Sequence, residues 1–387
     1  MEQTEKLYYI QPPIFQFEAT VLQCEPLQEH WQVVLNRTAF YPEGGGQACD
    51  LGTLGNVSVI DVQEKGGMVR HTVTAPLCVG STVTGQVDAA RRMELTQQHS
   101  GEHILSGTLH AMFGAENVGF HIGADYLTMD TNIPISDEQL AKAEAYANEI
   151  VWKNLPIDAV WYNKESLSTL TYRSKKELDG PVRIVTIPQA DCCACCGTHV
   201  QSTGEIGMIK IVDWQKYKSG TRLFVVCGIR AFRAFEQMRG ETTAIRTLLS
   251  AKNGALLQAV QHQAQELENA RFRVVQAENE LFSVLAQSVD PNQPVFLQQE
   301  HLSTDALRRL CSAVSAKTSH LCAVFTPNEN GTLSYAMAQT LPNADLRPLC
   351  TALNQAFCGR GGGKPGFVQG SITANFDAAV AFLQANL

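Results

Sequence analysis

The sequence has 387 residues, too many for one ordinary hydrophobic core, and therefore predicts two or three domains. Hydrophobic residues make up 44% of the chain and charged residues 18%, with no apolar run near the ~20 residues of a membrane span and no signal peptide, so we expect a globular, cytoplasmic protein without membrane contact. The net charge of −8 excludes binding of any polyanion through bulk charge, although a local basic face would still allow contact with a nucleic acid.

Residues 1–90 are predicted to form a small β-barrel. Strand-like segments at 31–42, 56–63 and 68–74 are short and separated by turns, a spacing typical of such barrels. Between the first two lies Tyr41-Pro42-Glu43-Gly44-Gly45-Gly46-Gln47, whose glycines allow positive φ angles or a close approach of the backbone to a ligand. A barrel turn without a ligand is the alternative interpretation.

From residue 91 the pattern changes to a mixed α+β domain that extends to residue 228. Apolar residues recur at helical intervals over 94–114, and a second helix is predicted near 137–155. Strand-like segments at 126–133, 182–187 and 208–214 alternate with these helices, and a group of four cysteines follows the second of them.

The last two segments are a helical linker, 229–290, and a C-terminal α/β domain, 291–387. The linker is nearly free of Pro and Gly, and its apolar residues recur at steps of three and four: Leu256, Val260, Leu267, Ala270, Val274, Ala277, Leu281 and Val284. This stripe indicates a coiled coil or a helical hairpin, with a helix packed on its own domain as the alternative. Asp290-Pro291 ends the linker, and the predicted fold class of the whole chain is α+β.

Two pairs of side chains predict a metal site. His99 and His103 are four residues apart on one helix, so both imidazoles can reach one ion. Cys195 and His199 have the same spacing around Gly197. Three imidazole nitrogens and one thiolate suit Zn²⁺ better than Mg²⁺ or Ca²⁺, so we expect one zinc ion per chain.

The first pair allows a different interpretation. His99-x-x-Glu102-His103 fits the H-x-x-E-H pattern of inverted zinc metallopeptidases, in which Glu102 would be the general base. That alternative explains neither Cys195 and His199 nor the glycine-rich motif.

Taken together, the motifs resemble those of a known family. Thr38 with Phe40-Tyr41-Pro42-Glu43-Gly44-Gly45-Gly46-Gln47, His99-x-x-x-His103 and Cys195-x-x-x-His199 stand in the same order in the AlaX family of alanyl-tRNA editing proteins and in the editing domain of alanyl-tRNA synthetase. The glycine-rich segment 359–370 resembles the C-terminal domain of that synthetase, shared with DHH-type phosphoesterases. The resemblance covers nearly the whole chain and implies the long AlaX type.

The resemblance implies roles for particular residues. It makes His99, His103, Cys195 and His199 zinc ligands, and it places Thr38 and the turn Gly44-Gly45-Gly46-Gln47 at the aminoacyl pocket. His121 stands where the synthetase domain often has a glutamine that faces the substrate. The chain departs from the synthetase at Cys196 and Glu102, where glycine and threonine are usual, so details of that pocket do not transfer.

The implied activity is hydrolysis of serine, and also of glycine, from alanine tRNA that carries the wrong amino acid. A charging pocket cannot strongly reject a substrate that only adds a hydroxyl, so a second site that binds the hydroxyl is needed. We expect Thr38 to bind it, and Glu102 and His121 to handle protons. Because the sequence begins at the barrel, deacylation without charging is expected. A tRNA-binding protein with a purely structural zinc is the non-enzymatic alternative.

The C-terminal segment is predicted to contact tRNA through Arg360 and Lys364, with a glycine turn that binds nothing as the alternative. ATP binding is excluded, because Cys358 and Pro365 occupy positions where a Walker loop requires Gly and Ser or Thr. Two chains paired through the helical linker or the C-terminal domain would form a homodimer.

Overall fold

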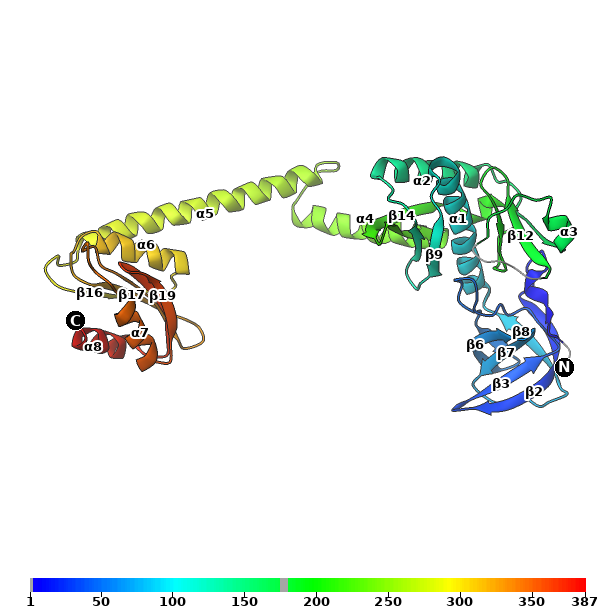
Figure 1. The fold of residues 1–387 in the computed structure, drawn as a ribbon, viewed down its shortest axis with the longest axis horizontal. Coiled ribbons are helices and arrows are strands. Elements are labelled where there is room, and N and C mark those ends of the chain that lie inside the picture. Colours follow the sequence, from blue (N-terminus) through cyan, green and yellow to red (C-terminus); the bar gives the residue numbers. More distant parts are fainter. Residues whose placement is uncertain (1–2, 175–179) are drawn as a thin grey trace. The chain divides into compact units, whose positions relative to one another are not determined.

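The computed structural model describes residues 3–174 and 180–387 (Figure 1). The chain divides into two compact units, Met1–Ala244 and Ile245–Leu387, and each is described by itself. Among the described residues, no helix is long and apolar enough to cross a membrane. The finer division into four domains stays a prediction.

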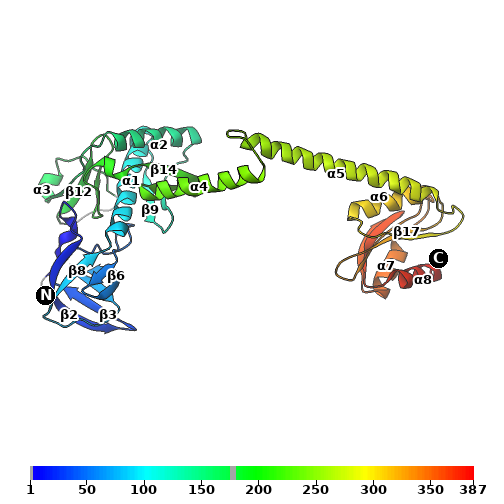
Figure 2. The ribbon, with the colours of Figure 1, turned by 180° about the vertical axis from the view of Figure 1, so that it is seen from behind.

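The N-terminal unit begins with a closed β-barrel (Figure 2). Its strands follow one another around the barrel in the order β2 (Gln16–Leu27), β3 (His30–Leu35), β7 (Met68–Val73), β6 (Val57–Lys65), β5 (Gly52–Leu54) and β8 (Thr82–Val87). Alternate side chains such as Val69, His71 and Val73 are buried inside it, as the period of two in a strand requires. A short parallel pair, β1 (Glu5–Lys6) and β4 (Arg37–Thr38), and the 3₁₀ helix η1 (Leu7–Tyr9) lie outside the barrel order.

The long helix α1 (Ala89–Phe113) leads from the barrel into the α+β part of this unit (Figure 1). It begins at Asp88, whose carboxylate accepts a hydrogen bond from the backbone of Arg91, and ends at Gly114, which has a left-handed φ of 67°. Most of its middle turns are buried, because α1 contacts one sheet on each side. Helix α2 (Asp137–Trp152) begins with a capping box made by Ser136 and Gln139.

Two antiparallel sheets accompany α1. The first has the order β14 (Ile209–Tyr217), β15 (Gly220–Cys227), β10 (Leu127–Thr131) and β9 (Asn117–Ile122). The second consists of β11 (Asp158–Tyr162), β12 (Val182–Ile187) and β13 (Asp191–Ala194), with the short helices α3 (Lys164–Leu167) and η2 (Thr203–Ile206) nearby in sequence. The loop after β13 carries the cysteine cluster, so the second sheet sets its position against α1.

The predicted helical linker consists of two helices. These are α4 (Ile229–Leu248) and α5 (Leu256–Gln287), and the break between them contains Gly254, with a φ of 75°. Several residues of the predicted stripe are exposed, including Val260, Leu267 and Val274, whereas Phe282 and Ala286 of α5 are buried. Coiled-coil pairing therefore stays a prediction.

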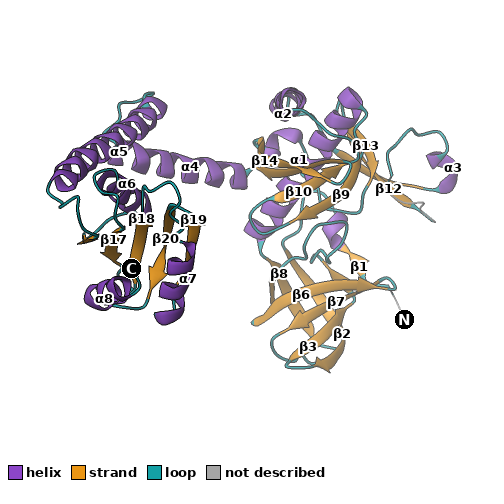
Figure 3. Cartoon of the chain, turned by 60° about the vertical axis from the view of Figure 1, so that its left-hand side comes forward, coloured by secondary structure: helices purple, strands orange, loops and turns teal. Residues whose placement is uncertain are grey.

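The C-terminal unit has one mixed five-stranded sheet with helices on both faces (Figure 3). Its strand order is β16 (Val295–Gln298), β17 (Cys322–Pro327), β18 (Leu333–Ala338), β20 (Phe367–Ile372) and β19 (Arg360–Lys364). Helices α5 and α6 (Thr304–Ser315) contribute to one core cluster, and α7 (Arg347–Ala356) and α8 (Phe376–Ala385) contribute to the other. The chain as a whole is thus a mixed α+β protein, as predicted.

Candidate metal centre and its cavity

Helix α1 presents His99 and His103 on one face. Their imidazole rings are stacked with centroids 5.4 Å apart, as expected for side chains one helical turn apart. Both side chains are buried, because this part of α1 faces the loop after β13.

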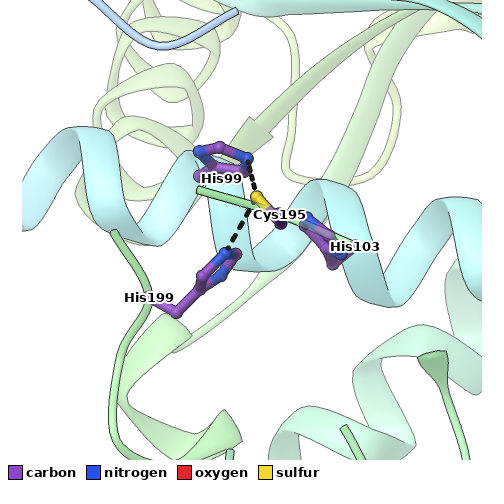
Figure 4. Close-up of side chains that lie close together, drawn as sticks. All are labelled: His99, His103, Cys195 and His199. Carbon is purple, nitrogen blue, oxygen red and sulfur yellow. Dashed lines mark hydrogen bonds between the residues drawn. The ribbon is translucent and has the colours of Figure 1, made fainter. Parts of the chain in front are cut away.

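That loop brings Cys195 and His199 to the same point (Figure 4). The Cys195 Sγ atom lies 3.4 Å from Nε2 of His99 and 3.4 Å from Nε2 of His199. One ligand atom from each of the four side chains, His103 included, lies within 4.8 Å of the others. The structure therefore brings together all four residues that the sequence spacing predicted as metal ligands.

Gly197 makes this approach geometrically feasible. A Cβ atom at Gly197 would lie 2.1 Å from Cε1 of His99, far inside van der Waals contact. The Arg183 guanidinium donates hydrogen bonds to the carbonyls of Cys195 (3.0 Å) and Gly197 (2.8 Å), and this fixes the loop. A side chain at Gly197 would push His99 out of the cluster.

Each of the three histidines has a partner for its other ring nitrogen. Nδ1 of His99 lies 2.8 Å from Oε1 of Gln47, and Nδ1 of His103 lies 2.8 Å from a carboxylate oxygen of Asp191. Nδ1 of His199 lies 3.3 Å from Oγ of Ser100. Such partners fix the tautomer of a ligating histidine and point Nε2 towards the metal. The arrangement fits a bound metal ion.

The thiol of Cys195 is suited to ligation. Its burial raises the pKa, but the neighbouring His99 and His103 side chains outweigh burial and hold the pKa well below its usual value. Burial instead raises the pKa of Cys193 to about 11, although Cys193, Asp191 and His103 form a second tight group. Of the two thiols, only that of Cys195 has the thiolate character of a metal ligand.

A cavity of about 820 Å³ opens beside the cluster. Its wall includes His99, His103 and Cys195 from the cluster, Glu102 from α1 and Gly45 from the barrel turn. Its volume is within the range of small-molecule sites, and several of its wall groups are polar.

Comparison with known proteins finds similar sequences along the whole chain. Residues 4–91 match the model described as "tRNA synthetases class II (A)", and residues 182–224 match "Threonyl and Alanyl tRNA synthetase second additional domain". The chain is 27% identical to the alanyl-tRNA editing protein AlaX-L of Pyrococcus horikoshii, over 99% of both chains. It is 32% identical to the alanyl-tRNA editing protein Aarsd1 of Bos taurus, over 60% of this chain and 57% of that one.

The similarity extends to a larger enzyme. The alanine–tRNA ligase of Pyrococcus abyssi is 28% identical over 96% of this chain, which spans only 42% of the ligase. The full-length match and the motif order agree. The chain is similar to the AlaX type of alanyl-tRNA editing protein over its whole length.

The glycine turn formed by residues 44–47 packs against the metal cluster. Gly44 and Gln47 exchange two backbone hydrogen bonds, and Gly45 and Gly46 have φ angles of 58° and 81°, as in a type I′ turn. A Cβ atom at Gly46 would lie 2.6 Å from the Phe120 ring. Gln47 is buried, and its side-chain amide is hydrogen-bonded to both His99 and Thr198. Gln47 therefore orients a ligand and does not line the cavity, contrary to its predicted contact with substrate. Of the turn, only Gly45 is at the cavity wall.

Thr38 does not line the cavity either. It is fully buried, and its Oγ1 atom lies 2.8 Å from Nε2 of His71 and accepts a hydrogen bond from the backbone of Phe40. Burial lowers the pKa of His71 to about 4, and its Nδ1 donates to the carbonyl of Val33, so Nε2 accepts the Thr38 hydroxyl proton. The expectation that Thr38 binds the serine hydroxyl is therefore not supported by its position.

The two residues predicted to handle protons, Glu102 and His121, lie in different environments. Glu102 is buried at the cavity wall, where its carboxylate accepts a hydrogen bond from the Asn117 amide. His121 is exposed on β9, next to Phe120, whose ring faces His99. Neighbouring side chains in a strand point to opposite faces, so His121 points away from the cluster. Its predicted catalytic role is not supported.

The predicted tRNA contacts lie in the other unit. Arg360 and Lys364 are the first and last residues of β19, which is an edge strand and exposed along its length. They lie on the sheet surface and not in the turn that the glycine run suggested.

Sequence reasoning missed the supporting residues Asp191, Ser100 and Arg173. Arg173 donates hydrogen bonds to Asp191 (2.8 Å) and to Ser106 of α1 (2.9 Å). Asp191 directly precedes the cysteine cluster, and an acidic residue at the start of a buried strand is the one signal that pointed to it. Arg173 carries no comparable signal.

Proposed function

We propose that this chain hydrolyses the ester bond between a wrong amino acid and alanine tRNA, with Ser-tRNA(Ala) and Gly-tRNA(Ala) as substrates, in the cytoplasm. The observation that carries the proposal is the cluster of four metal-ligand side chains at the wall of an 820 Å³ cavity. The full-length similarity to a protein named for alanyl-tRNA editing supports the choice of substrate.

The proposed metal is one Zn²⁺ per chain, held by His99, His103, Cys195 and His199. Three imidazoles and a thiolate form a donor set typical of zinc and unlike the oxygen-rich sites of Mg²⁺ or Ca²⁺. When bound, zinc supplies a Lewis acid beside the cavity. Gln47, Asp191 and Ser100 keep the three imidazoles in the orientation that binding requires.

Glu102 is the proposed proton acceptor. Its carboxylate is at the cavity wall next to the ligands on α1, where an attacking water would stand between it and the ester. The hydrogen bond from Asn117 fixes the carboxylate, so the proton acceptor is oriented before substrate arrives. General-base catalysis of this kind contributes about 10²- to 10⁴-fold to a rate.

The C-terminal unit is proposed to hold the tRNA body through Arg360 and Lys364, whose side chains are free to approach phosphates from the exposed edge of the sheet. Pairing of two chains through the linker helices or this unit is proposed as the route to a homodimer. The four-part domain division, with borders near 90, 228 and 290, belongs to the same proposal.

The two alternatives differ from this function in observable ways. A peptidase of the H-x-x-E-H type uses His99 and His103 with Glu102 as base, but here Cys195 and His199 complete the set of ligands. A tRNA-binding protein with a structural zinc would keep its tRNA affinity and metal without turnover. No contact in the cluster favours either alternative over the deacylase.

The decisive experiment incubates the zinc-loaded protein with Ser-, Gly- and Ala-charged alanine tRNA in parallel, and with casein. We expect release of serine and glycine, retention of alanine and intact casein. Glu102→Gln should retain zinc and lose about 10²- to 10⁴-fold in rate. Binding of tRNA with no release of any amino acid would establish the non-catalytic alternative.

A further inference from the structure

A pair of aromatic side chains stands outside the cavity of the N-terminal unit. Trp161 on the edge strand β11 and Tyr9 of η1 have ring centroids 5.6 Å apart, with ring planes at 80°. Trp161 is 49% exposed, although it is one of the largest apolar side chains. Its neighbour across the strand pair is Arg183 of β12, whose guanidinium lies 4.9 Å from the centre of the Tyr9 ring.

Contacts of Tyr9 and Arg183 connect this pair to the loop of the metal cluster. The Tyr9 hydroxyl donates a hydrogen bond to the carbonyl of Cys196 (3.2 Å), and Cys196 lines the cavity. Burial raises the pKa of Tyr9, so the hydroxyl keeps its proton and remains a donor. Arg183 binds the carbonyls on either side, those of Cys195 and Gly197. Trp161 is thereby connected, through Tyr9, to one residue of the cavity wall and to the loop that carries Cys195.

We propose that Trp161 is a stacking site for a nucleobase in the unpaired 3′ end of the tRNA, immediately before the terminal adenosine. The inference rests on the proposed function: when the terminal aminoacyl ester is in the cavity, the preceding nucleotides must cross its rim. Proteins bind unpaired bases by stacking them on exposed aromatic rings, without reading base identity. Tyr9 and Arg183 set the position of the indole ring, and Trp161 provides the contact.

Trp152 provides a matched control within the same chain. It ends helix α2 and is 71% exposed, more than Trp161, and like Trp161 it is not among the residues that line the cavity. Exposed single apolar residues are common on protein surfaces, so exposure alone does not distinguish the two tryptophans. What distinguishes Trp161 is its ring contact with Tyr9, whose hydroxyl is hydrogen-bonded to Cys196 of the cavity wall.

The test compares two substrates of the full-length, zinc-loaded protein: Ser-tRNA(Ala), and 3′-O-seryl-adenosine, which lacks the preceding nucleotides. Trp161→Ala should lower kcat/KM on the tRNA by about 5- to 150-fold, the effect of one stacked base, and leave hydrolysis of seryl-adenosine unchanged. Trp161→Phe should restore most of the loss, and Trp152→Ala should change neither substrate. Equal losses on both substrates, or equal effects of Trp161→Ala and Trp152→Ala, would overturn the proposal.

A binding experiment separates failure of this inference from failure of the proposed function. Uncharged acceptor-stem RNA hairpins with and without the unpaired 3′ nucleotides are titrated while tryptophan fluorescence is recorded. The complete hairpin should quench the fluorescence and bind more tightly than the shortened one, and Trp161→Ala should remove both differences even if no ester is ever hydrolysed. If Trp161→Ala instead halves the mass in solution and leaves RNA binding unchanged, β11 pairs with a second copy of the chain and the proposal fails.

Discussion

The two glycine-rich segments of the chain have similar compositions and different structures. In the turn formed by residues 44–47, Gly45 and Gly46 have positive φ angles, and the turn is hydrogen-bonded to β9 through the Gly46 carbonyl. In β19, Gly361, Gly362 and Gly363 are in an extended strand that is exposed at the edge of a sheet. The first segment needs glycine for its backbone angles, whereas the second needs it for space.

The space requirement in β19 alternates along the strand. A Cβ atom at Gly361 would lie 2.5 Å from the Tyr335 hydroxyl, and one at Gly363 would lie 2.2 Å from the Phe367 carbonyl, but one at Gly362 would meet nothing within 4 Å. The difference teaches that a run of glycines does not by itself indicate a ligand-binding loop. Only the partners of each glycine show whether it serves a turn, close packing or an open surface.

The largest expected effect follows from loss of a metal ligand. The 44–47 turn is connected to these ligands through the hydrogen bond between Gln47 and His99. Cys195→Ala and His103→Ala should each lose the bound zinc and deacylation together, because three remaining ligands around a buried site leave the ion undercoordinated. Metal content by elemental analysis and release of serine from Ser-tRNA(Ala) measure the two losses. Cys78→Ala, at an exposed thiol outside both the cluster and the cavity wall, is the control and should keep both. Retention of a full zinc complement in both ligand variants would contradict the assignment.

The next effect separates the two glycine segments directly. Gly46→Ala should destabilise the N-terminal unit by about 2–4 kcal/mol, because it adds left-handed backbone strain to overlap with Phe120. Gly45→Ala has the strain but open space, so about 1–2 kcal/mol is expected, and Gly362→Ala has neither, so its effect should lie within about 0.5 kcal/mol. Denaturant unfolding of the three variants measures the loss in free energy of unfolding for each. Equal losses for Gly46→Ala and Gly362→Ala would show that the two segments do not differ in their need for glycine.

A smaller effect tests whether the 44–47 turn serves the metal and not the substrate. Gln47→Leu keeps the side-chain size but removes the acceptor for Nδ1 of His99, so zinc affinity should fall about 10- to 100-fold. Competition with a zinc chelator measures the affinity. Gln63→Leu, at an exposed barrel glutamine, should not change it. If Gln47→Leu raised KM for Ser-tRNA(Ala) at full zinc occupancy, the original placement of Gln47 at the substrate would be restored.

Thr38 gives the corresponding test for the barrel. Thr38→Val leaves Nε2 of buried His71 without its donor, so the free energy of unfolding should fall by about 1–3 kcal/mol. Thr84→Val, at an exposed position of β8, should cost much less. Because Thr38 does not line the cavity, activity on seryl and glycyl substrates should change by the same factor. A loss confined to the seryl substrate would show that the hydroxyl does select serine.

Local spacing predicted the parts of the site that lie on one element. His99 and His103 share a helix face, and Cys195 and His199 share a loop, so four-residue spacing was sufficient for each pair. The residues that orient them are distant in sequence: Gln47 and His99 are 52 positions apart, and Asp191 and His103 are 88 apart. Such contacts depend on how the barrel, α1 and β13 pack, which no local pattern contains.

The expected placements that the geometry does not support have the same origin. His121 was expected at the substrate, but the register of β9 turns it to the face opposite Phe120, and a one-residue difference in register reverses the face of every side chain. Thr38 was expected at the pocket because of its position in a motif. Its hydroxyl is instead hydrogen-bonded to buried His71, which is 33 residues away in the sequence. The break between α4 and α5 had a local signal in Gly254, which was outweighed by the helical pattern around it.

The smallest expected effect concerns the second glycine segment. If β19 contacts the tRNA backbone, Arg360→Ala with Lys364→Ala should weaken tRNA binding and lower the slope of log affinity against log salt by about 2, one for each lost phosphate contact. The double variant Arg308→Ala with Lys317→Ala removes two other exposed charges from the same unit and controls for net charge. Because both pairs change the net charge equally, only a local contact predicts a difference between them. Identical salt slopes for the two double variants would make β19 a structural edge strand, with its glycines retained for packing against Tyr335 and β20.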